Sequence, residues 1–380
     1  MDFRPTEEQA LLRRTVREFA ETEIRPHVRE WDQAQHFPTE LMPKLASLGL
    51  LGIQVPERYG GAQLSGIDYC ICIEELARID PGVALSVAAH NGLCSAHLFM
   101  FGTEDQKQKF LVPLARGEKI GAWGLTESTS GSDAAGMRTT ARRAGNCWSI
   151  SGAKTFTTHG RVGDIMVVMA VTNRALGRKG ISAFVVERGT PGMTPGKKED
   201  KLGMRASDTS EVLFDGCRVP IDHLVGEEGQ GFVNTMEVLD AGRIGIAALA
   251  VGLAQGAYEA ALSYARERKA FGRTISSFQA IQWKLADAAT RIEAARLLTY
   301  RCAYLKQQGK RTTIESSIAK LYASEVAVRV ADECVQIHGG YGFVKDYPAE
   351  KYFRDVKLTT IGEGTSEIQR LVIARQLLSR

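Results

Sequence analysis

Apolar and polar positions follow helical periodicity over the first third of the chain. Residues 67–79 carry the apolar repeat of a helix, which ends at Asp80 before a proline. Near the N-terminus, Thr6 stands three residues before Gln9, the spacing of a capping box that opens a helix. Residues 1–120 are therefore predicted to form a helical N-terminal domain.

The pattern changes between residues 121 and 231, where glycine, threonine, serine and β-branched residues become frequent. Short β-branched and aromatic runs bounded by glycine and proline turns are typical of strands in a compact β domain. Strands are expected over residues 146–158, 164–172, 180–188 and 211–220. Residues 121–231 are therefore predicted to form a middle β-barrel or sandwich domain.

Helical periodicity returns after residue 231, in longer segments than before. One segment repeats apolar residues on a single face, at Ile281, Leu285, Ala288, Ile292, Ala295 and Leu298. Helices are expected over residues 232–269, 278–308, 313–337 and 366–378, with Ser366 and Gln369 as a capping box for the last. The predicted fold class is α+β, mostly α, with residues 232–380 forming a C-terminal four-helix bundle.

Composition argues against several classes of protein. The net charge of +4 is dispersed among 24% charged residues, so no nucleic-acid partner is predicted. The longest apolar run, residues 244–254, is too short to span a bilayer, and no signal-peptide core is evident near the N-terminus. Seven scattered cysteines without a disulfide framework indicate reduced thiols and a cytoplasmic protein, and no HExxH or CxxC spacing supports a metal site.

One carboxylate is distinguished by its neighbours. Glu363 lies between Gly362 and Gly364, directly before the last predicted helix. Because glycines let a backbone approach a ligand closely, a carboxylate held there is a candidate base. The alternative for an isolated Glu-Gly pair is a solvated loop.

Three other segments contain ligand-binding chemistry, each with a plain structural alternative. Residues 124–136 are rich in hydroxyls and glycines, which suits an anionic or heteroaromatic ligand or a flexible surface loop. In residues 154–160, Phe156 could stack on a planar ring and Thr158 could hydrogen-bond its edge, or the segment could be an ordinary strand. Basic residues in 266–273 could clamp a pyrophosphate or complement the dipole at a helix C-terminus.

Taken together, these segments resemble the acyl-CoA dehydrogenase family, in the same order and over essentially the whole chain. The resemblance is carried by GLTESTSGSDAAG, KTFTTHG, GKKEDKLGMR, LDAGRIGIA, YARERKAFG, QIHGGYGF and IGEGTSEIQR. It implies the three-domain fold predicted above, one FAD per subunit, and a homotetramer arranged as a dimer of dimers. It also implies α,β-dehydrogenation of an acyl-CoA substrate, with electrons passed to an electron-transfer flavoprotein.

The resemblance also implies roles for individual residues, with Glu363 as the catalytic base. The residues implied to bind FAD within the subunit are Trp123, Leu125, Thr126, Gly131, Ser132, Phe156, Thr157 and Thr158, with Thr365 and Glu367 on the adenosine side. Those implied to reach the FAD of a neighbouring subunit are Arg268, Phe278, Gln279, Gln336, Gly339 and Gly340, with Ala270 as a further cofactor contact. Those implied to contact the substrate are Ser132, Asp240, Arg243, Glu363 and Gly364.

Three positions differ from what other members of the family carry. Residues 127–130 read ESTS where members often have EPGAG or EPGNG, so the loop lacks a proline and a glycine and its conformation is left open. Phe156 stands where many members have tryptophan. Gly242 stands where the isovaleryl-CoA type carries its base, which keeps the implied base at Glu363.

In the implied reaction, Glu363 removes the pro-R α proton while the β hydride passes to the flavin. The Glu363 N–H and a flavin ribityl hydroxyl are expected to hold the substrate carbonyl. The adjacent helix N-terminus lowers the pKa of Glu363 and desolvation raises it, and the sequence leaves this balance open.

The segments GKKEDKLGMR and LDAGRIGIA look most like those of the short-chain, butyryl-CoA type. Straight-chain substrates of about four to six carbons are therefore expected, because a methylene forced into a filled pocket is unfavourable. The alternatives are an acyl-CoA oxidase that uses oxygen, a short branched-chain acyl-CoA dehydrogenase, and a flavin-containing relative that binds nucleic acid.

Overall fold

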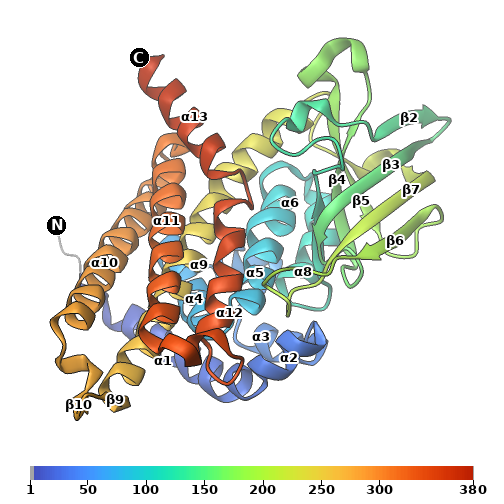
Figure 1. Cartoon of the computed structure of the whole chain (residues 1–380). Coiled ribbons are helices and arrows are strands. Elements are labelled where there is room, and N and C mark those ends of the chain that lie inside the picture. Colours follow the sequence, from blue (N-terminus) through green and yellow to red (C-terminus); the bar gives the residue numbers. More distant parts are fainter. Residues whose placement is uncertain (1–3, 380) are drawn as a thin grey trace.

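The computed structural model describes residues 4–379, and in chain order it has a helical region, a β region and a second helical region (Figure 1). This order confirms the predicted fold class. The outermost residues of the first and last predicted domains, 1–3 and 380, lie outside the described residues.

The N-terminal region is helical, and most residues of its helix α4 are buried. Its α-helices are α1 Glu7–Phe19, α2 Val28–Ala34, α3 Met42–Ser47, α4 Gly66–Ile79, α5 Pro81–Ala89, α6 Ala96–Phe101, α7 Glu104–Gln106 and α8 Val112–Ala115. Short 3-10 or π turns join them at η1 Ala20–Ile24, η2 Arg25–His27, η3 Thr39–Leu41, η4 Glu57–Tyr59, η5 His90–Ser95 and η6 Lys107–Leu111. The predicted capping box of α1 is confirmed, because Thr6 and Gln9 exchange hydrogen bonds of 3.1 and 3.2 Å.

The run Pro81–Phe101 has the length and apolar composition of a membrane-crossing helix. However, 67% of its apolar window is buried inside the protein, where it packs against α4 and α9. A helix that is apolar on all sides is expected at such a central position in the core.

The middle region is one curved sheet with strand order β6-β7-β3-β2-β4-β5-β8, and β1 pairs with β4 in parallel. The strands are β1 Gly121–Gly124, β2 Thr140–Ala144, β3 Cys147–Thr158, β4 Ile165–Val171, β5 Ile181–Glu187, β6 Met193–Lys198, β7 Thr209–Pro220 and β8 Leu224–Val225, with 3-10 turns at η7 Ala134–Gly136, η8 Arg174–Gly180 and η9 Ile221–His223. The four predicted strands correspond to β3, β4, β5 and β7. One face encloses its own core around Trp148 and Phe184, and the other face of β4 and β5 packs against helices of the first region.

The C-terminal region is a bundle built on three long helices. Its elements are α9 Gly231–Glu267, β9 Lys269–Ala270, β10 Arg273–Thr274, η10 Ile275–Ser277, α10 Gln279–Gln307, α11 Thr313–His338, η11 Gly339–Phe343, α12 Ala349–Val356, η12 Lys357–Thr360 and α13 Ser366–Leu378. The predicted apolar stripe of α10 lies against the core, with Ala288, Ile292 and Ala295 buried. Helix α13 projects beyond the body of the bundle (Figure 1).

Helix α9 packs against α4 of the first region as closely as two backbones allow. A Cβ added at Gly252 would lie 2.2 Å from the carbonyl oxygen of Glu74, and one at Gly256 would lie 2.2 Å from that of Arg78. These glycines therefore permit the close contact between the two helices.

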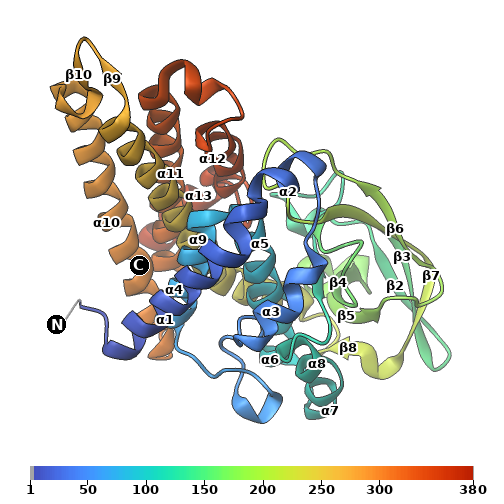
Figure 2. The same ribbon diagram turned by 90° about the horizontal axis from the view of Figure 1, so that it is seen from below.

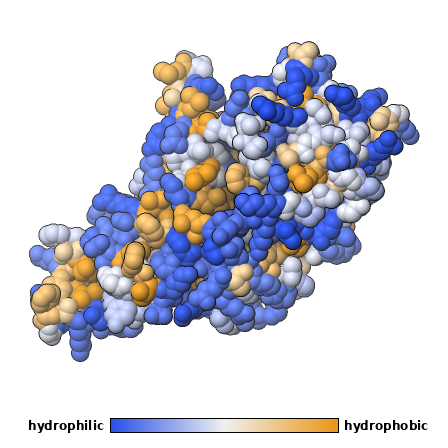
Figure 3. Space-filling view, turned by 45° about the vertical axis from the view of Figure 1, so that its right-hand side comes forward, coloured by the Kyte–Doolittle hydropathy of each residue, from blue (hydrophilic) through white to orange (hydrophobic). Residues whose placement is uncertain are grey.

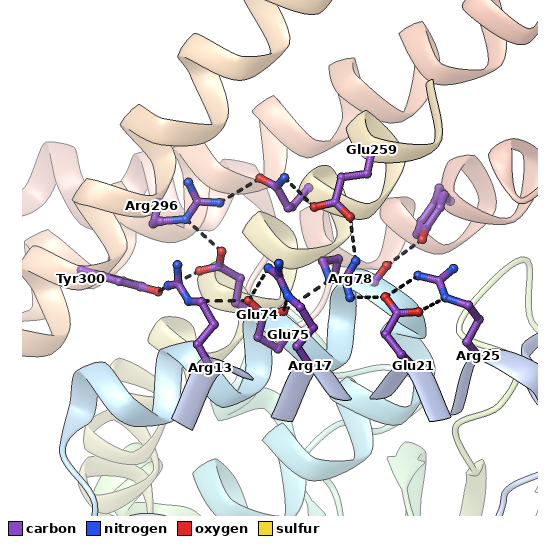
Figure 4. Close-up of polar contacts among 12 residues, drawn as sticks. Arg13, Arg17, Glu21, Arg25, Glu74, Glu75, Arg78, Glu259, Arg296 and Tyr300 are labelled. Atoms are coloured by element: carbon purple, nitrogen blue, oxygen red, sulfur yellow. Dashed lines mark hydrogen bonds and ion pairs between the residues drawn. The ribbon is translucent and has the colours of Figure 1, made fainter. Parts of the chain in front are cut away.

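Charged side chains join the same helices to their neighbours, as Figure 4 shows. Three charged residues of α4 project toward its neighbours, and one ion pair joins α4 to each of α1, α9 and α10. The pairs are Arg17–Glu75 at 2.9 Å, Arg78–Glu259 at 2.7 Å and Arg296–Glu74 at 2.9 Å. Because the network is almost fully hydrogen-bonded, it fixes α9 relative to the first region.

Candidate active site

A cavity of about 1090 Å³ lies where loops of the β region meet α5, α9 and the start of α13. Figure 3 shows apolar surface gathered in a hollow between the protruding C-terminal helix and the β region. The sequence-predicted residues that line the cavity are Trp123, Leu125, Thr126, Gly131, Ser132, Phe156, Thr158, Arg243, Glu363, Gly364 and Thr365. Segments more than 200 residues apart in the sequence thus meet at one site.

Glu363 occupies a strained position on the wall of this cavity. Its φ of 53° is left-handed, which is unfavourable for a residue with a side chain and is common at functional sites. The residue as a whole is partly exposed, yet its carboxylate oxygen Oε2 is buried and has no hydrogen-bond partner among the described residues. A buried and unpaired carboxylate oxygen is available to react with a ligand.

The backbone of α9 makes the room for this carboxylate. A Cβ added at Gly242 would lie 2.1 Å from Glu363 Oε2, closer than any two such atoms can approach. With the carboxylate in this position, only a glycine fits at 242. A side chain at position 242 would occupy the space that the Glu363 carboxylate fills.

Burial dominates the electrostatics of Glu363. Desolvation raises its pKa to about 7, while the positive charges of Arg243 and Lys320 act in the opposite direction. The pKa balance that the sequence left open is therefore decided in favour of desolvation. A carboxylate with a pKa near 7 is matched to general-base catalysis at neutral pH.

The start of α13 differs from its prediction. The N-cap is Thr365, whose side chain accepts a hydrogen bond from the Ile368 N–H at 3.3 Å, and Ser366 is already the first helical residue. The predicted Ser366–Gln369 capping box is wrong, because two hydroxyl residues stand in sequence and the first takes the cap. Gln369 instead turns back and donates to the carbonyl oxygens of Glu363 at 3.2 Å and Gly364 at 2.9 Å.

The loop after β1 is held by a buried ion pair. Glu127 accepts hydrogen bonds from Lys154 Nζ at 2.8 Å and from the backbone N–H of Thr139 at 2.9 Å. Glu127 and Ser130 also exchange two backbone hydrogen bonds of 3.0 Å. These contacts fix a loop that the ESTS sequence left uncertain, and they hold Thr126 at the cavity wall.

The three predicted residues at the end of β3, residues 156–158, point to alternate faces of the strand. Phe156 and Thr158 line the cavity, and Phe156 has a φ of 54° and is 64% exposed. Thr157 between them is buried outside the lining, as expected when successive side chains of a strand point to opposite faces. The structure therefore does not bring Thr157 to the cavity through its side chain.

Two other predicted residues do not line the cavity. Asp240 faces the bundle, where its carboxylate accepts from Arg243 and from the Thr313 hydroxyl, both at 2.5 Å. It thereby orients Arg243, which does line the cavity. Glu367 is exposed on the outside of α13.

A second set of predicted residues lies at the far end of the bundle and does not reach this cavity. Its members are Arg268, Ala270, Phe278, Gln279, Gln336, Gly339 and Gly340. Here the Arg268 guanidinium lies over the Tyr341 ring at 5.5 Å, and Phe271, which is 94% exposed, contacts Phe278 at 6.0 Å between centroids. These residues form a polar and aromatic surface around β9 and β10.

Sequence reasoning missed several residues that shape the site. Lys320 and Gln369 contact the loop that carries Glu363, and Leu85, Ala89 and Leu93 form an apolar wall. For Lys320 a signal was present, because it shares a helix face with the buried residues Ser316, Ala323 and Ala327. A lysine at a core position of a helix needs a specific partner.

Titratable side chains elsewhere in the described chain do not form a metal centre. No group of three or more His, Cys, Asp or Glu residues within 4–379 could hold a metal ion. All seven cysteines are free thiols.

Comparison with known families covers almost the whole chain. Residues 6–118 match the family model of the acyl-CoA dehydrogenase N-terminal domain, residues 122–217 that of the middle domain and residues 229–378 that of the C-terminal domain.

Individual relatives have similar sequences and structures. A short-chain specific acyl-CoA dehydrogenase of Clostridium acetobutylicum is 48% identical over 99% of this chain and 100% of its own. The mitochondrial short-chain specific acyl-CoA dehydrogenase of Mus musculus is 46% identical over 98% of this chain and 90% of its own. Among solved structures, butyryl-CoA dehydrogenase of Megasphaera elsdenii has a TM-score of 0.98 and 44% identity, with 100% of both chains covered. A chain in the structure of the electron transferring flavoprotein of Acidaminococcus fermentans has a TM-score of 0.99 and 46% identity, also with 100% of both covered.

Proposed function

The chain belongs to the acyl-CoA dehydrogenase family, and on that premise we propose that Glu363 removes the α proton of a short-chain acyl-CoA thioester. The protein is an acyl-CoA dehydrogenase with FAD as its cofactor. The observation that carries the proposal is the carboxylate of Glu363, desolvated and unpaired on the wall of the large cavity.

The residues around the cavity fit an FAD. Trp123 and Phe156 offer aromatic faces, and the hydroxyls of Thr126, Ser132 and Thr158 offer hydrogen bonds to the edge of a heteroaromatic ring. A Cβ added at Gly131 would meet no atom within 4 Å, so the loop is open to a ligand there. When bound, FAD supplies the acceptor for the hydride that leaves the substrate β carbon.

The residues of the chain supply the proton chemistry. The carboxylate of Glu363 takes the α proton, and the C–H electron pair becomes the new double bond of the trans-2-enoyl-CoA as the β hydrogen departs. An unaided α carbon is too weak an acid for a carboxylate, so the thioester carbonyl needs a donor that stabilises the developing negative charge. We assign that role to the backbone N–H of Glu363.

The acyl chain occupies the apolar side of the cavity. Leu85, Ala89 and Leu93 line it together with Leu239 and Ile246 of α9. Relatives named for short-chain substrates support an acyl group of about four to six carbons, because each methylene beyond the pocket must displace packed side chains at roughly 1–3 kcal/mol.

The far-end set acts across a subunit interface in this proposal. Arg268, Gln336 and Gly340 lie outside the cavity of their own chain, and in a homotetramer they contact the FAD of a neighbouring subunit. Electrons leave to an electron-transfer flavoprotein, in keeping with the structure from Acidaminococcus fermentans. The free thiols support a cytoplasmic location.

An anaerobic titration tests the substrate class. Butyryl-CoA and hexanoyl-CoA are expected to bleach the flavin absorbance fastest, and palmitoyl-CoA and isovaleryl-CoA slowly. Faster bleaching by palmitoyl-CoA would overturn the short-chain assignment, and faster bleaching by isovaleryl-CoA would favour the branched-chain alternative. Oxygen consumption with butyryl-CoA and no mediator would favour the oxidase alternative.

A further inference from the structure

Lys320 is buried in α11 directly behind the loop that carries Glu363. Its side chain is fully inaccessible, and its Nζ donates a hydrogen bond of 2.7 Å to the carbonyl oxygen of Gly364. Within residues 4–379 this ammonium forms no ion pair with a carboxylate, unlike the other fully buried lysine, Lys154, which pairs with Glu127 at 2.8 Å. An ammonium buried without an ion pair is expensive, so its position requires a reason.

The Gly364 carbonyl belongs to the turn that carries the left-handed Glu363. Glu363 and Gly364 have successive φ values of 53° and 96°, both left-handed. Lys320 and Gln369 hold this turn through the same atom, because the Gln369 amide also donates to the Gly364 carbonyl oxygen, at 2.9 Å. Such strain persists only where the surroundings determine the conformation, and these two donors do so here.

The titratable groups that face Glu363 come from three helices, and two of them carry a charge. Arg243 on α9 and Lys320 on α11 favour its ionised form, and Tyr69 on α4 contributes a neutral phenol whose pKa is raised well above normal by burial. Arg243 is already paired with Asp240 at 2.5 Å. Lys320, by contrast, has no ion pair with a carboxylate among the described residues. It interacts with Glu363 and Glu367 only at longer range.

We propose that Lys320 is a positioning residue for the reaction: it clamps the Gly364 carbonyl to hold Glu363 in its left-handed conformation, and its positive charge favours the ionised carboxylate. The inference rests on the proposed role of Glu363 as the base. Burial lowers the pKa of Lys320 to about 8, so the ammonium is present across the neutral range in which the base must be ionised.

The test is the pH dependence of anaerobic flavin reduction by butyryl-CoA in FAD-loaded Lys320→Met. Without the positive charge, the acid-side midpoint is expected to move to higher pH by on the order of one unit. The maximal rate at high pH should also fall, by roughly tenfold or more, because the loop loses its clamp. Lys284→Met on α10, which removes a lysine paired with Glu333, is the matched control and should leave the midpoint unchanged.

A second variant separates the electrostatic effect from the clamp on the Gly364 carbonyl. It also keeps the proposal testable if Lys320→Met does not fold. Lys320→Gln retains a hydrogen-bond donor and removes the charge, so its midpoint should shift as in Lys320→Met while its maximal rate falls less. An unshifted midpoint in either folded variant would overturn the electrostatic role, and an undiminished maximal rate in Lys320→Met would overturn the clamp. If Glu363→Gln is still active, the proposed function fails instead, and the two failures are thereby distinguished.

Discussion

The residues predicted to serve one cofactor lie in two regions of the molecule with opposite properties. Around the cavity, Glu363 is strained, and Arg243, Lys320 and Gln369 are buried around the loop that carries it. At the far end of the bundle, near β9 and β10, Arg268, Gln279 and Gln336 are exposed. Figure 2 shows β9 and β10 at the opposite end of the bundle from the β region, as Figure 1 does.

The difference indicates what each region needs in order to function. The cavity brings its charges, its apolar wall and its strained loop together within a single chain. The far end presents aromatic and cationic side chains to solvent, including Phe271 at 94% exposure, and exposed apolar surface of this kind is typical of an interaction site. Changes at the cavity should therefore affect the chemistry, whereas changes at the far end should affect cofactor retention and assembly.

The strongest test of the cavity is Glu363→Gln. The substitution keeps the shape and removes the basicity, so the rate of flavin reduction by butyryl-CoA should fall by about 10²–10⁴-fold or more. FAD absorbance should remain, because the residues that line the flavin side are untouched. Stopped-flow absorbance under anaerobic conditions measures both, and a variant that reduces its flavin at the wild-type rate would refute the assignment of the base.

Gly242→Ala tests the geometry of the same carboxylate without removing it. The added methyl would lie 2.1 Å from Glu363 Oε2, so the carboxylate must move. A displacement of about 1 Å at a reacting group typically reduces the rate by about 10²-fold. Gly252→Ala on the same helix is the control: its Cβ would meet the Glu74 backbone at 2.2 Å and should lower the thermal midpoint without a comparable loss of rate per folded, FAD-loaded subunit.

Arg268→Ala tests the far end. If Arg268 makes the proposed contact across subunits, its loss should weaken FAD retention by about tenfold, equivalent to 1.4 kcal/mol, as measured by flavin release on dilution. The pH midpoint of flavin reduction in the loaded enzyme should not change, since Arg268 is not among the charges that face Glu363. A shifted midpoint with unaltered FAD binding would contradict the division between the two regions.

A further expected effect is on stability. Because the folded-state pKa of Glu363 is raised to about 7, the native protein binds more protons than the unfolded chain between about pH 4.3 and 7. Its contribution to the free energy of unfolding is therefore largest at low pH and is lost as the pH rises through 7. Glu363→Gln should gain stability relative to wild type between pH 5 and pH 8 in denaturant titrations, and a pH-independent difference would contradict the desolvation argument.

The sequence predicted the architecture well where periodicity is strong. The long helices α9, α10 and α11 and the strands β3, β4, β5 and β7 were expected within a few residues of their bounds. The short strands β1, β2, β6 and β8 were missed, because two to six residues carry too little pattern to be distinguished from turns.

At the candidate site, local motifs predicted the residues on loops, and tertiary packing decided the rest. Thr126, Phe156 and Glu363 lie at the cavity as motif positions suggested, whereas Thr157 is buried in the β region and Asp240 faces the bundle. Side-chain direction depends on strand alternation and on helix neighbours, which the motifs do not encode. The pKa of Glu363 could not be predicted either, because it depends on burial in the folded protein and on Arg243 and Lys320, which come from other helices.

The central claim is that burial makes Glu363 a base that titrates near neutral pH. Infrared difference spectroscopy of the FAD-loaded protein, recorded as a pH titration against Glu363→Gln, follows the protonated carboxyl band of this one residue. The account predicts a band that is absent from the variant and disappears with a midpoint near pH 7. A midpoint near 4.3, the value of an unperturbed glutamate, would contradict it.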